Sequence, residues 1–334
     1  MSSLPEPGTE PGSGRPDVLV HRFRSFDLPF HASLNDHFTI LDPWTDSPPD
    51  EPAHAFLARR AGRARALVCV GPTTLPADTL RLLPSLRVVI GTSAGVDHID
   101  LRECRRRGIA VTNAGAAFAE DVADYAVALL LDVLRRISAA DRYLKEGLWL
   151  KSGNYPLGSK LGGKRVGIVG LGNIGSQVAK RLQPFGCDIA YNSRSKKPSF
   201  PFPYHATVHD LAANSDVLVL CCALTEETHH VINREVMTVL GDRGVIINVG
   251  RGSLIDENEL VQFLVRGELG GAGLDVFEDE PNVPKELFGL DSVVLSPHRA
   301  VITPESFEAM RELTVSNLKA FFVNEPLSCL VRLE

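Results

Sequence analysis

The stretch GIVGLGNIGSQVAK, residues 167–180, decides the fold expected for this chain. Gly170, Gly172 and Gly175 form the pattern G-x-G-x-x-G directly after the apolar run RVGIV and at the start of a helical pattern. Glycines at these positions permit a tight turn, close approach of the backbone to a pyrophosphate and close packing of helix on strand. The first N–H groups of the helix are free to bind phosphate oxygens. The stretch therefore predicts a dinucleotide-binding βαβ unit, with a glycine-rich structural turn as the alternative.

Apolar, β-rich runs alternate with helical patterns on both sides of this stretch, which favours parallel sheets covered by helices. We expect strands at 17–23, 38–41, 66–70, 87–91 and 109–113, and a second series at 165–170, 188–192, 216–222, 244–250, 271–277 and 292–298. One long apolar helical pattern, 116–147, connects the two series. A last helix is predicted after Thr303, its N-cap, with Pro304 in the first helical position.

The predicted fold class is α/β, with two doubly wound parallel-sheet domains. We expect a Rossmann cofactor domain over 116–299. A discontinuous, flavodoxin-like substrate domain is expected over 17–115 and 300–334, because the last helix can fold back on the first strand series. Residues 1–16, rich in Pro, Gly and Glu, are predicted to be a disordered tail. Doubly wound folds bind ligands beyond the carboxyl ends of their strands, so the ligand crevice is expected between the two domains.

Composition excludes several classes of function. The chain has 334 residues and a net charge of −6, so a nucleic-acid partner is not expected. The six cysteines are scattered, without a C-x-x-C pair, and indicate neither a zinc site nor a disulfide framework. No apolar run approaches the roughly 20 residues that span a bilayer, and the N-terminus lacks the apolar core of a signal peptide. We therefore expect no metal and no membrane partner, and a cytoplasmic protein.

The end of the second strand of the βαβ unit predicts which dinucleotide is bound. An acidic residue there would accept hydrogen bonds from the ribose 2′-hydroxyl of NAD. This chain instead has Ser193, Arg194 and Ser195, followed by two lysines. A hydroxyl and a guanidinium bind a 2′-phosphate, which a carboxylate would repel. The sequence thus predicts NADPH (NADP+) as the cofactor, with a basic solvated loop as the alternative.

Three polar residues follow predicted strands in the second half of the chain. Arg251 lies between two glycines, Glu280 lies in the acidic run EDE, and His298 follows Ser-Pro. An arginine binds a carboxylate in a fork, and a carboxylate beside a histidine orients the ring and favours its charged form. Together the three residues predict a site for a small 2-oxo acid, with His298 as proton donor. Taken singly, each has an alternative: a surface ion pair, a solvated turn and a capped loop residue.

The sequence resembles the D-isomer-specific 2-hydroxyacid dehydrogenase family over nearly the whole chain after residue 17. The similar motifs are GIVGLGNIG, CALTEETHHVIN, INVGRGSLIDENEL, GGAGLDVFEDEP and SPH, in family order. Glu280 and His298 lie 29 and 47 residues after Arg251, which matches the family's catalytic Arg/Glu/His triad. By that match Glu280, and not Glu278, is the partner of the histidine.

The resemblance also implies binding residues. Asp275 matches the residue that holds the nicotinamide carboxamide, and the backbone amides of Ala94 and Gly95 match those that receive the substrate carboxylate. The implied cofactor-binding set is Gly170, Gly172, Asn173, Ile174, Ser193, Arg194, Ser195, Thr228, Val249 and Asp275. Arg251 also belongs to the implied substrate-binding set.

Within the family the chain is most similar to plant-type glyoxylate/hydroxypyruvate reductases, sharing DRYLKEGLW, the serine-arginine end of the second strand and VPKELFGLDSVVLSPH. This implies NADPH-dependent reduction of glyoxylate and hydroxypyruvate by a homodimer formed through the region of the connecting helix. In such dimers a Trp at the place of Trp149 reaches the neighbouring site; a buried structural Trp is the alternative.

Two departures from the family affect the choice of substrate. Ala114-Gly115 replaces Thr-Pro, which we expect to loosen a loop near the cofactor, and Arg299-Ala300-Val301 adds a bulky cation after the histidine. Reduction of hydroxyphenylpyruvate remains an alternative function. Oxidation of phosphoglycerate is less favoured, because the chain ends soon after the last helix. A cofactor-sensing binding protein, like the dehydrogenase-related corepressors, is the alternative from another class.

Overall fold

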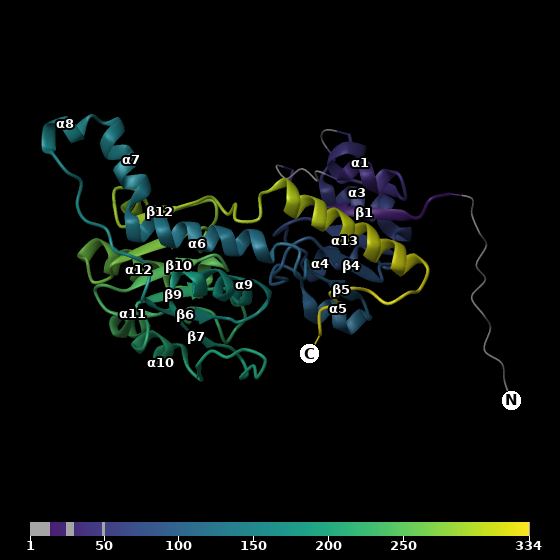
Figure 1. Cartoon of the computed structure of the whole chain (residues 1–334). Helices are drawn as coiled ribbons and strands as arrows, with labels where there is room; N and C mark the ends of the chain where they lie inside the picture. The colour runs from purple at the N-terminus through teal and green to yellow at the C-terminus, as the bar shows by residue number, and fades with distance from the viewer. Residues whose placement is uncertain (1–13, 25–29, 49–50, 334) are drawn as a thin grey trace. The chain divides into compact units, whose positions relative to one another are not determined.

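The structure is a computed structural model that describes residues 14–24, 30–48 and 51–333. These residues form two units (Figure 1). The first contains the residues up to Ala114 together with those from Met310 onward, and the second is Gly115–Ala309. Of the tail predicted at 1–16, residues 1–13 lie outside the described residues.

The first unit is built on a five-stranded parallel sheet in the order β2-β1-β3-β4-β5. This is the flavodoxin-like order, in which the strand order reverses between β1 and β3. All residues of β3 and β4 are buried, as expected of strands covered on both faces. The strands are β1 (Asp17–His21), β2 (Thr39–Leu41), β3 (Ala66–Cys69), β4 (Val88–Gly91) and β5 (Ala110–Thr112). The helices are α1 (His31–Asn35), α2 (Pro43–Asp46), α3 (Ala53–Arg60), α4 (Ala77–Arg81) and α5 (Leu101–Arg107), with the 3-10 turn η1 (Ala61–Arg63).

The last helix, α13 (Pro304–Phe322), returns the chain to the first unit. Its N-terminus is capped as predicted: the N–H of Ser306 donates to Thr303 Oγ1 at 3.0 Å. Further along, Leu318 is fully buried, and the ring of Phe322 lies 5.8 Å from that of Phe38 in the first unit. The expected packing of this helix on the first strand series is therefore present.

The second unit contains a seven-stranded parallel sheet in the order β12-β11-β10-β9-β6-β7-β8. Counted within the unit, this is the Rossmann order 3-2-1-4-5-6 with one further strand, so the predicted fold class is confirmed. The strands are β6 (Arg165–Val169), β7 (Asp188–Asn192), β8 (Tyr204–His205), β9 (Val217–Leu220), β10 (Val245–Asn248), β11 (Gly271–Leu274) and β12 (Val293–Leu295). The helices are α6 (Ala119–Arg135), α7 (Ile137–Lys145), α8 (Leu148–Ser152), α9 (Asn173–Leu182), α10 (Val208–Ala213), α11 (Arg234–Leu240) and α12 (Glu257–Arg266), with the 3-10 turns η2 (Gln183–Phe185), η3 (Gly252–Leu254) and η4 (Lys285–Leu287).

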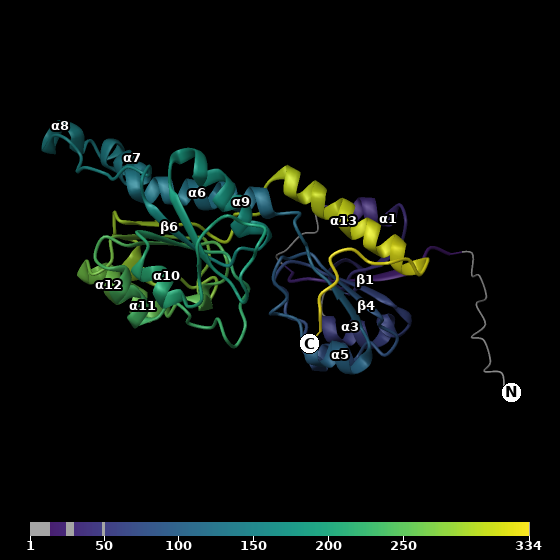
Figure 2. The same cartoon turned by 60° about the horizontal axis from the view of Figure 1, so that its bottom comes forward.

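The prediction of a single connecting helix over 116–147 is wrong, because the structure has separate helices in this region. The helix breaks at Arg136, which has a left-handed backbone with φ 56° and separates α6 from α7. The N–H of Ser138 donates to Asp132 Oδ1 at 2.8 Å, and this bond holds the start of α7. The two views place α6 beside α9, where Arg181 pairs with Asp124, while α7 and α8 project from the unit as an arm (Figures 1 and 2).

Candidate active site

The glycine loop between β6 and α9 has the geometry that a pyrophosphate requires. Gly170 has φ 95°, and a Cβ there would lie 2.6 Å from the backbone of Cys222. A Cβ on Gly175 would lie 2.1 Å from the carbonyl oxygen of Gly170, so helix and strand meet closely. At Gly172, by contrast, a Cβ would meet nothing within 4 Å, and no side chain caps the helix that follows. The open side of the loop therefore presents backbone N–H groups, which suits a phosphate.

The loop after β7, which carries the three residues predicted to recognise a 2′-phosphate, is supported by two tyrosines. The hydroxyl of buried Tyr191 accepts a 2.7 Å hydrogen bond from the N–H of Lys197. The hydroxyl of Tyr204, in the unpredicted strand β8, donates to the carbonyl oxygen of Ser193 at 3.3 Å. Arg194 and Ser195 are exposed. The Arg194 side chain is thus exposed to solvent, while hydrogen bonds to the two tyrosine hydroxyls hold the backbone of the loop.

The other predicted cofactor residues lie at the same edge of this sheet. Thr228 follows β9, and its hydroxyl donates to the carbonyl oxygen of Ala223 at 2.8 Å, closing a turn. Val249 follows β10 and is buried. Asn173 and Ile174 begin α9, directly after the glycine loop. The carboxyl ends of parallel strands β6, β7, β9 and β10 thus bring the whole predicted set to one edge.

His298 and Glu280 form the pair that the sequence predicted. His298 Nδ1 lies 2.8 Å from Glu280 Oε2, and both side chains are about one third exposed, at 31% and 32%. Burial acts to raise the pKa of Glu280, but the hydrogen bond and charge of His298, with the charge of Arg251, outweigh it, and the pKa is lowered. The Glu280 carboxylate is therefore ionised. Because it binds Nδ1 of His298, Nε2 is the ring nitrogen left for a substrate.

The backbone around His298 is held by Asp275, whose side chain is 1% exposed. His298 itself has a left-handed backbone with φ 48°, a conformation that costs energy for a residue other than glycine. The carboxylate of Asp275 accepts from the Ser296 hydroxyl and from the N–H groups of Arg299 and Ala300, the last two at 2.9 Å each. In this structure Asp275 thus fixes the SPHRA turn; its predicted contact with a nicotinamide carboxamide stays a prediction.

Arg251 follows β10 in the same unit and is held by its neighbours. Its carbonyl oxygen accepts a 2.8 Å hydrogen bond from Asn248 Nδ2, and its Nη1 donates to the carbonyl oxygen of Gly250 at 3.0 Å. A Cβ on Gly252 would lie 1.9 Å from the carbonyl carbon of Phe277, so the Arg251 turn packs directly on the turn that carries Glu280. The charge of Arg251 also acts on the pKa of Glu280, as noted above. The arginine and the His–Glu pair therefore belong to one group of loops.

In the first unit, Ala94 and Gly95 lie in the turn after β4. Their carbonyl oxygens are occupied: Asn113 Nδ2 donates to Ala94 at 3.0 Å and the Ser93 hydroxyl donates to Gly95 at 2.7 Å. Neither backbone N–H of the two donates to a protein acceptor within the described ranges. Both amides are therefore available to a ligand; that they bind the substrate carboxylate stays a prediction.

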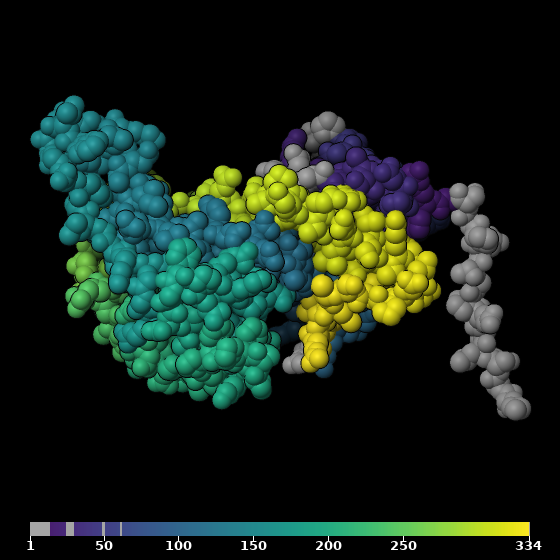
Figure 3. All heavy atoms as spheres, viewed as in Figure 1, coloured from purple at the N-terminus to yellow at the C-terminus, as the bar shows by residue number. Residues whose placement is uncertain are grey.

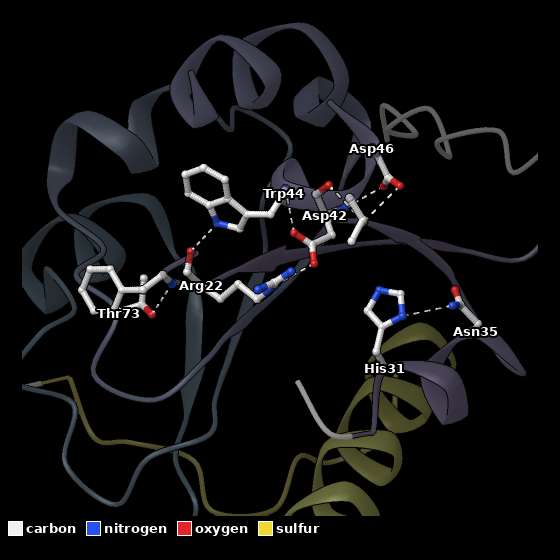
Figure 4. Close-up of polar contacts among 9 residues, drawn as sticks. Arg22, His31, Asn35, Asp42, Trp44, Asp46 and Thr73 are labelled. Carbon is white, nitrogen blue, oxygen red and sulfur yellow. Dashed lines mark hydrogen bonds and ion pairs between the residues drawn. The ribbon is translucent and has the colours of Figure 1, made fainter. Parts of the chain in front are cut away.

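Sequence reasoning missed a polar network at the carboxyl edge of the first sheet (Figure 4). Arg22 follows β1 and forms a 2.8 Å ion pair with Asp42, which follows β2; their side chains are 9% and 1% exposed. Trp44 Nε1 donates to the carbonyl oxygen of Arg22 at 2.7 Å, and Thr73 Oγ1, after β3, accepts from the N–H of Phe23 at 3.2 Å. The network ties three strand ends together at the reversal of strand order. Its members are far apart in sequence, so no motif reveals it.

The two departures from the family have clear structural consequences. Gly115 has φ 57°, a value that proline cannot adopt, and its carbonyl oxygen accepts from Asn173 Nδ2 at 3.0 Å. Proline would therefore not fit this backbone, and the loop is tied to the start of α9 by this bond; the expected loosening stays a prediction. Arg299 is exposed beside His298, with its N–H bound to Asp275.

The chain belongs to the D-isomer-specific 2-hydroxyacid dehydrogenase family. Residues 127–300 match the NAD-binding domain of that family. A glyoxylate/hydroxypyruvate reductase of Arabidopsis thaliana is 56% identical over 319 residues, which cover 96% of this chain and 98% of the relative. A hydroxyphenylpyruvate reductase of Plectranthus scutellarioides is 48% identical, over 88% of this chain and 92% of the relative.

Solved structures agree with this assignment. An NADPH-dependent glyoxylate/hydroxypyruvate reductase from Sinorhizobium meliloti, crystallised with NADP and malonate, has a TM-score of 0.86 to this chain. It is 36% identical, and the match covers 96% of this chain and 98% of that one. A glyoxylate reductase from Paecilomyes thermophila has a TM-score of 0.85 at 28% identity, over 95% and 98% of the two chains.

Proposed function

We propose that this protein reduces small 2-oxo acids, glyoxylate and hydroxypyruvate, to 2-hydroxy acids with NADPH. The observation that carries the proposal is the His298–Glu280 pair, at 2.8 Å, on loops that pack against the Arg251 turn. The similarity to glyoxylate/hydroxypyruvate reductases, at 56% identity in one case, supports the same reaction.

Each protein group has one task in this reaction. Arg251 holds the substrate carboxylate and carbonyl oxygen in its fork. When bound, NADPH supplies the hydride. His298 Nε2 gives its proton to the carbonyl oxygen, and Glu280, bound to Nδ1, holds the ring in the orientation that this transfer needs.

NADPH is favoured over NADH because the ribose end of the site has no acid. Ser193 and Arg194 stand at the end of β7, where a carboxylate would accept from a 2′-hydroxyl. The loop carries the cations Arg194, Lys196 and Lys197, which suit a 2′-phosphate. A relative of known structure that was crystallised with NADP supports this choice.

The proposal is tested with the variant His298→Ala. Turnover should fall by several orders of magnitude in both directions, while NADPH still quenches or shifts the protein fluorescence as in the parent chain. His209→Ala is the matched control, because His209 is an exposed histidine in α10 beside an aspartate. Retention of more than a tenth of the parent turnover in His298→Ala would remove this histidine from the reaction.

Hydroxyphenylpyruvate is the second candidate substrate. It is favoured by the 48% identity to a hydroxyphenylpyruvate reductase. The two candidates differ in the size of the group beside the keto carbon, so comparison of kcat/KM for hydroxypyruvate and hydroxyphenylpyruvate decides between them.

We further propose that the protein is a homodimer of the cytoplasm. The arm formed by α7, α8 and the segment after them projects from its unit (Figure 3). Its large apolar side chains are exposed: Ile137, Leu144, Trp149, Leu150 and Leu157, at 56%, 55%, 61%, 98% and 94%. Such a cluster favours a protein partner, and a second copy of the chain can cover it. The exposure of Trp149 also excludes the alternative of a buried structural Trp.

The unpaired cysteines support the proposed cytoplasmic location. All six cysteines lie in the described part of the chain, and none of them is disulfide-bonded there. Unpaired thiols fit a reducing compartment. No helix among the described residues is long and apolar enough to cross a membrane.

A further inference from the structure

A second histidine–glutamate pair lies on the turn that carries Glu280. His230 Nε2 is 2.6 Å from Glu278 Oε1, with side chains 33% and 30% exposed. Unlike the His298–Glu280 pair, this one has a third neighbour: the ring of His229 stacks on that of His230, with centroids 3.9 Å apart. One donor atom from each of His229, His230 and Glu278 lies within 4.8 Å of the other two.

The backbone brings these three side chains together. Consecutive residues of an extended chain point to opposite sides, but His230 has a left-handed backbone with φ 51°, and its ring comes to lie beside that of His229. The N–H of His230 donates to the carbonyl oxygen of Ser253 at 2.9 Å, and the N–H of Glu278 donates to Glu257 Oε2 at 3.1 Å. Both loops are thus fixed by backbone bonds, independently of the side-chain pair.

The proposed reaction gives no task to these three residues, and the hydrogen bond between His230 and Glu278 leaves His229 unexplained. Glu278 forms its hydrogen bond with His230, and the ring of His229 stacks beside that ring with centroids 3.9 Å apart. Two imidazole nitrogens and one carboxylate oxygen are the ligand set that zinc and its neighbours in the transition series prefer. Magnesium and calcium prefer oxygen ligands alone.

We propose that His229, His230 and Glu278 bind one divalent ion of the zinc class. The ion takes the place of the proton between His230 Nε2 and Glu278 Oε1, and His229 supplies the third protein ligand. Donor atoms of a tetrahedral zinc site lie about 3.4 Å apart, given bond lengths of about 2.0–2.2 Å. The His230–Glu278 pair, at 2.6 Å, must therefore open by about 0.8 Å, and the exposed ring of His229 must move inward by up to about 1.4 Å from the 4.8 Å limit. Solvent supplies the fourth ligand.

The surrounding charge favours a cation at this place. Glu278, Asp279 and Glu280 are consecutive acidic residues, and the Oε2 atom of a further acid, Glu257, accepts from the Glu278 N–H at 3.1 Å. Four carboxylates thus lie on or against this turn and repel one another. A bound cation relieves this repulsion and ties the loop after β9 to the turn after β11.

Direct binding of zinc tests the proposal without reference to catalysis. Tag-free full-length protein is stripped with a chelator and dialysed, and ZnCl2 is titrated in by calorimetry, with a chromophoric chelator as competitor. We expect one ion per chain. His229→Ala and Glu278→Gln should each weaken binding by about tenfold or more, the loss typical of damage to a metal site. Equal melting temperatures without metal show that each variant is folded.

Two matched variants locate the ion. His209→Ala removes an exposed histidine that lies 4.0 Å from Asp210 and belongs to no three-ligand group among the described residues, and it should leave the affinity unchanged. His298→Ala removes the histidine of the neighbouring pair and should also leave it unchanged. The proposal is overturned if the parent chain binds no stoichiometric zinc, if His229→Ala binds as tightly as the parent, or if binding is lost only with His298. These outcomes are independent of whether the protein reduces 2-oxo acids.

Discussion

Glu280→Gln is the substitution that separates the charge of Glu280 from its shape. Glutamine keeps an oxygen for the Phe277 N–H, which donates to Glu280 Oε1 at 3.1 Å, so the turn should persist. It loses the negative charge 2.8 Å from His298 Nδ1. His298 and Arg251 lower the pKa of Glu280, so the carboxylate is ionised and the substitution removes a full charge from the pair.

The magnitude can be worked from the geometry. A hydrogen bond to a charged group contributes about 1.5–3 kcal/mol. The lower end applies here, since both side chains are about one third exposed. A loss of roughly 1.5 kcal/mol corresponds to about a tenfold loss in kcat/KM.

The assay is the pH profile of kcat/KM for reduction. Reduction needs protonated His298, so the rate is high at low pH and falls as the proton is lost. In Glu280→Gln kcat/KM for reduction should fall by about tenfold and the falling limb should move to lower pH, with the Kd of NADPH unchanged. Glu278→Gln, two residues away and paired with another histidine, is the matched control and should leave the limb in place when a chelator is present. An unmoved limb in Glu280→Gln would refute the role of this carboxylate.

Three further outcomes are expected. Arg251→Lys keeps the charge but loses the fork, so kcat/KM should fall by about 2–3 kcal/mol of transition-state binding, and activity within twofold of the parent would remove Arg251 from the site. Ser193→Asp combined with Arg194→Gln should reverse a preference for NADPH over NADH, measured as the ratio of the two kcat/KM values; an unchanged ratio would assign recognition of the 2′-phosphate elsewhere. Leu150→Asp, at a side chain 98% exposed, should convert a dimer to a monomer in light scattering without lowering the helix signal, and an unchanged mass would place the dimer contact outside the arm.

Much of the fold was predictable because parallel strands that are buried on both faces appear in the sequence as short, continuous apolar runs. All residues of β9 and β10 are buried, and both strands lie within predicted runs. Strand β8 escaped prediction because it is only Tyr204–His205, too short for any periodicity. The break at Arg136 escaped because neither glycine nor proline marks it; the signal that remained was the pair Asp132 and Ser138.

The site residues were predictable where a single polar side chain stands at the end of a predicted strand. His298, Arg251 and Glu280 were found in this way, and the resemblance then set Glu278 aside as the partner of the histidine. The structure shows that each carboxylate holds a different histidine. The partner of Glu278, His230, lies 48 positions earlier and converges on it through a left-handed backbone, which no spacing rule indicates.

The most direct test of the proposed function is a comparison of initial rates. Purified full-length protein is assayed with glyoxylate, hydroxypyruvate and hydroxyphenylpyruvate, each with NADPH and with NADH at equal concentrations. The predicted result is turnover of glyoxylate and hydroxypyruvate, with the higher kcat/KM for NADPH. Absence of turnover with every 2-oxo acid, in a protein that still binds NADPH, would contradict the account and leave a cofactor-sensing binding protein in its place.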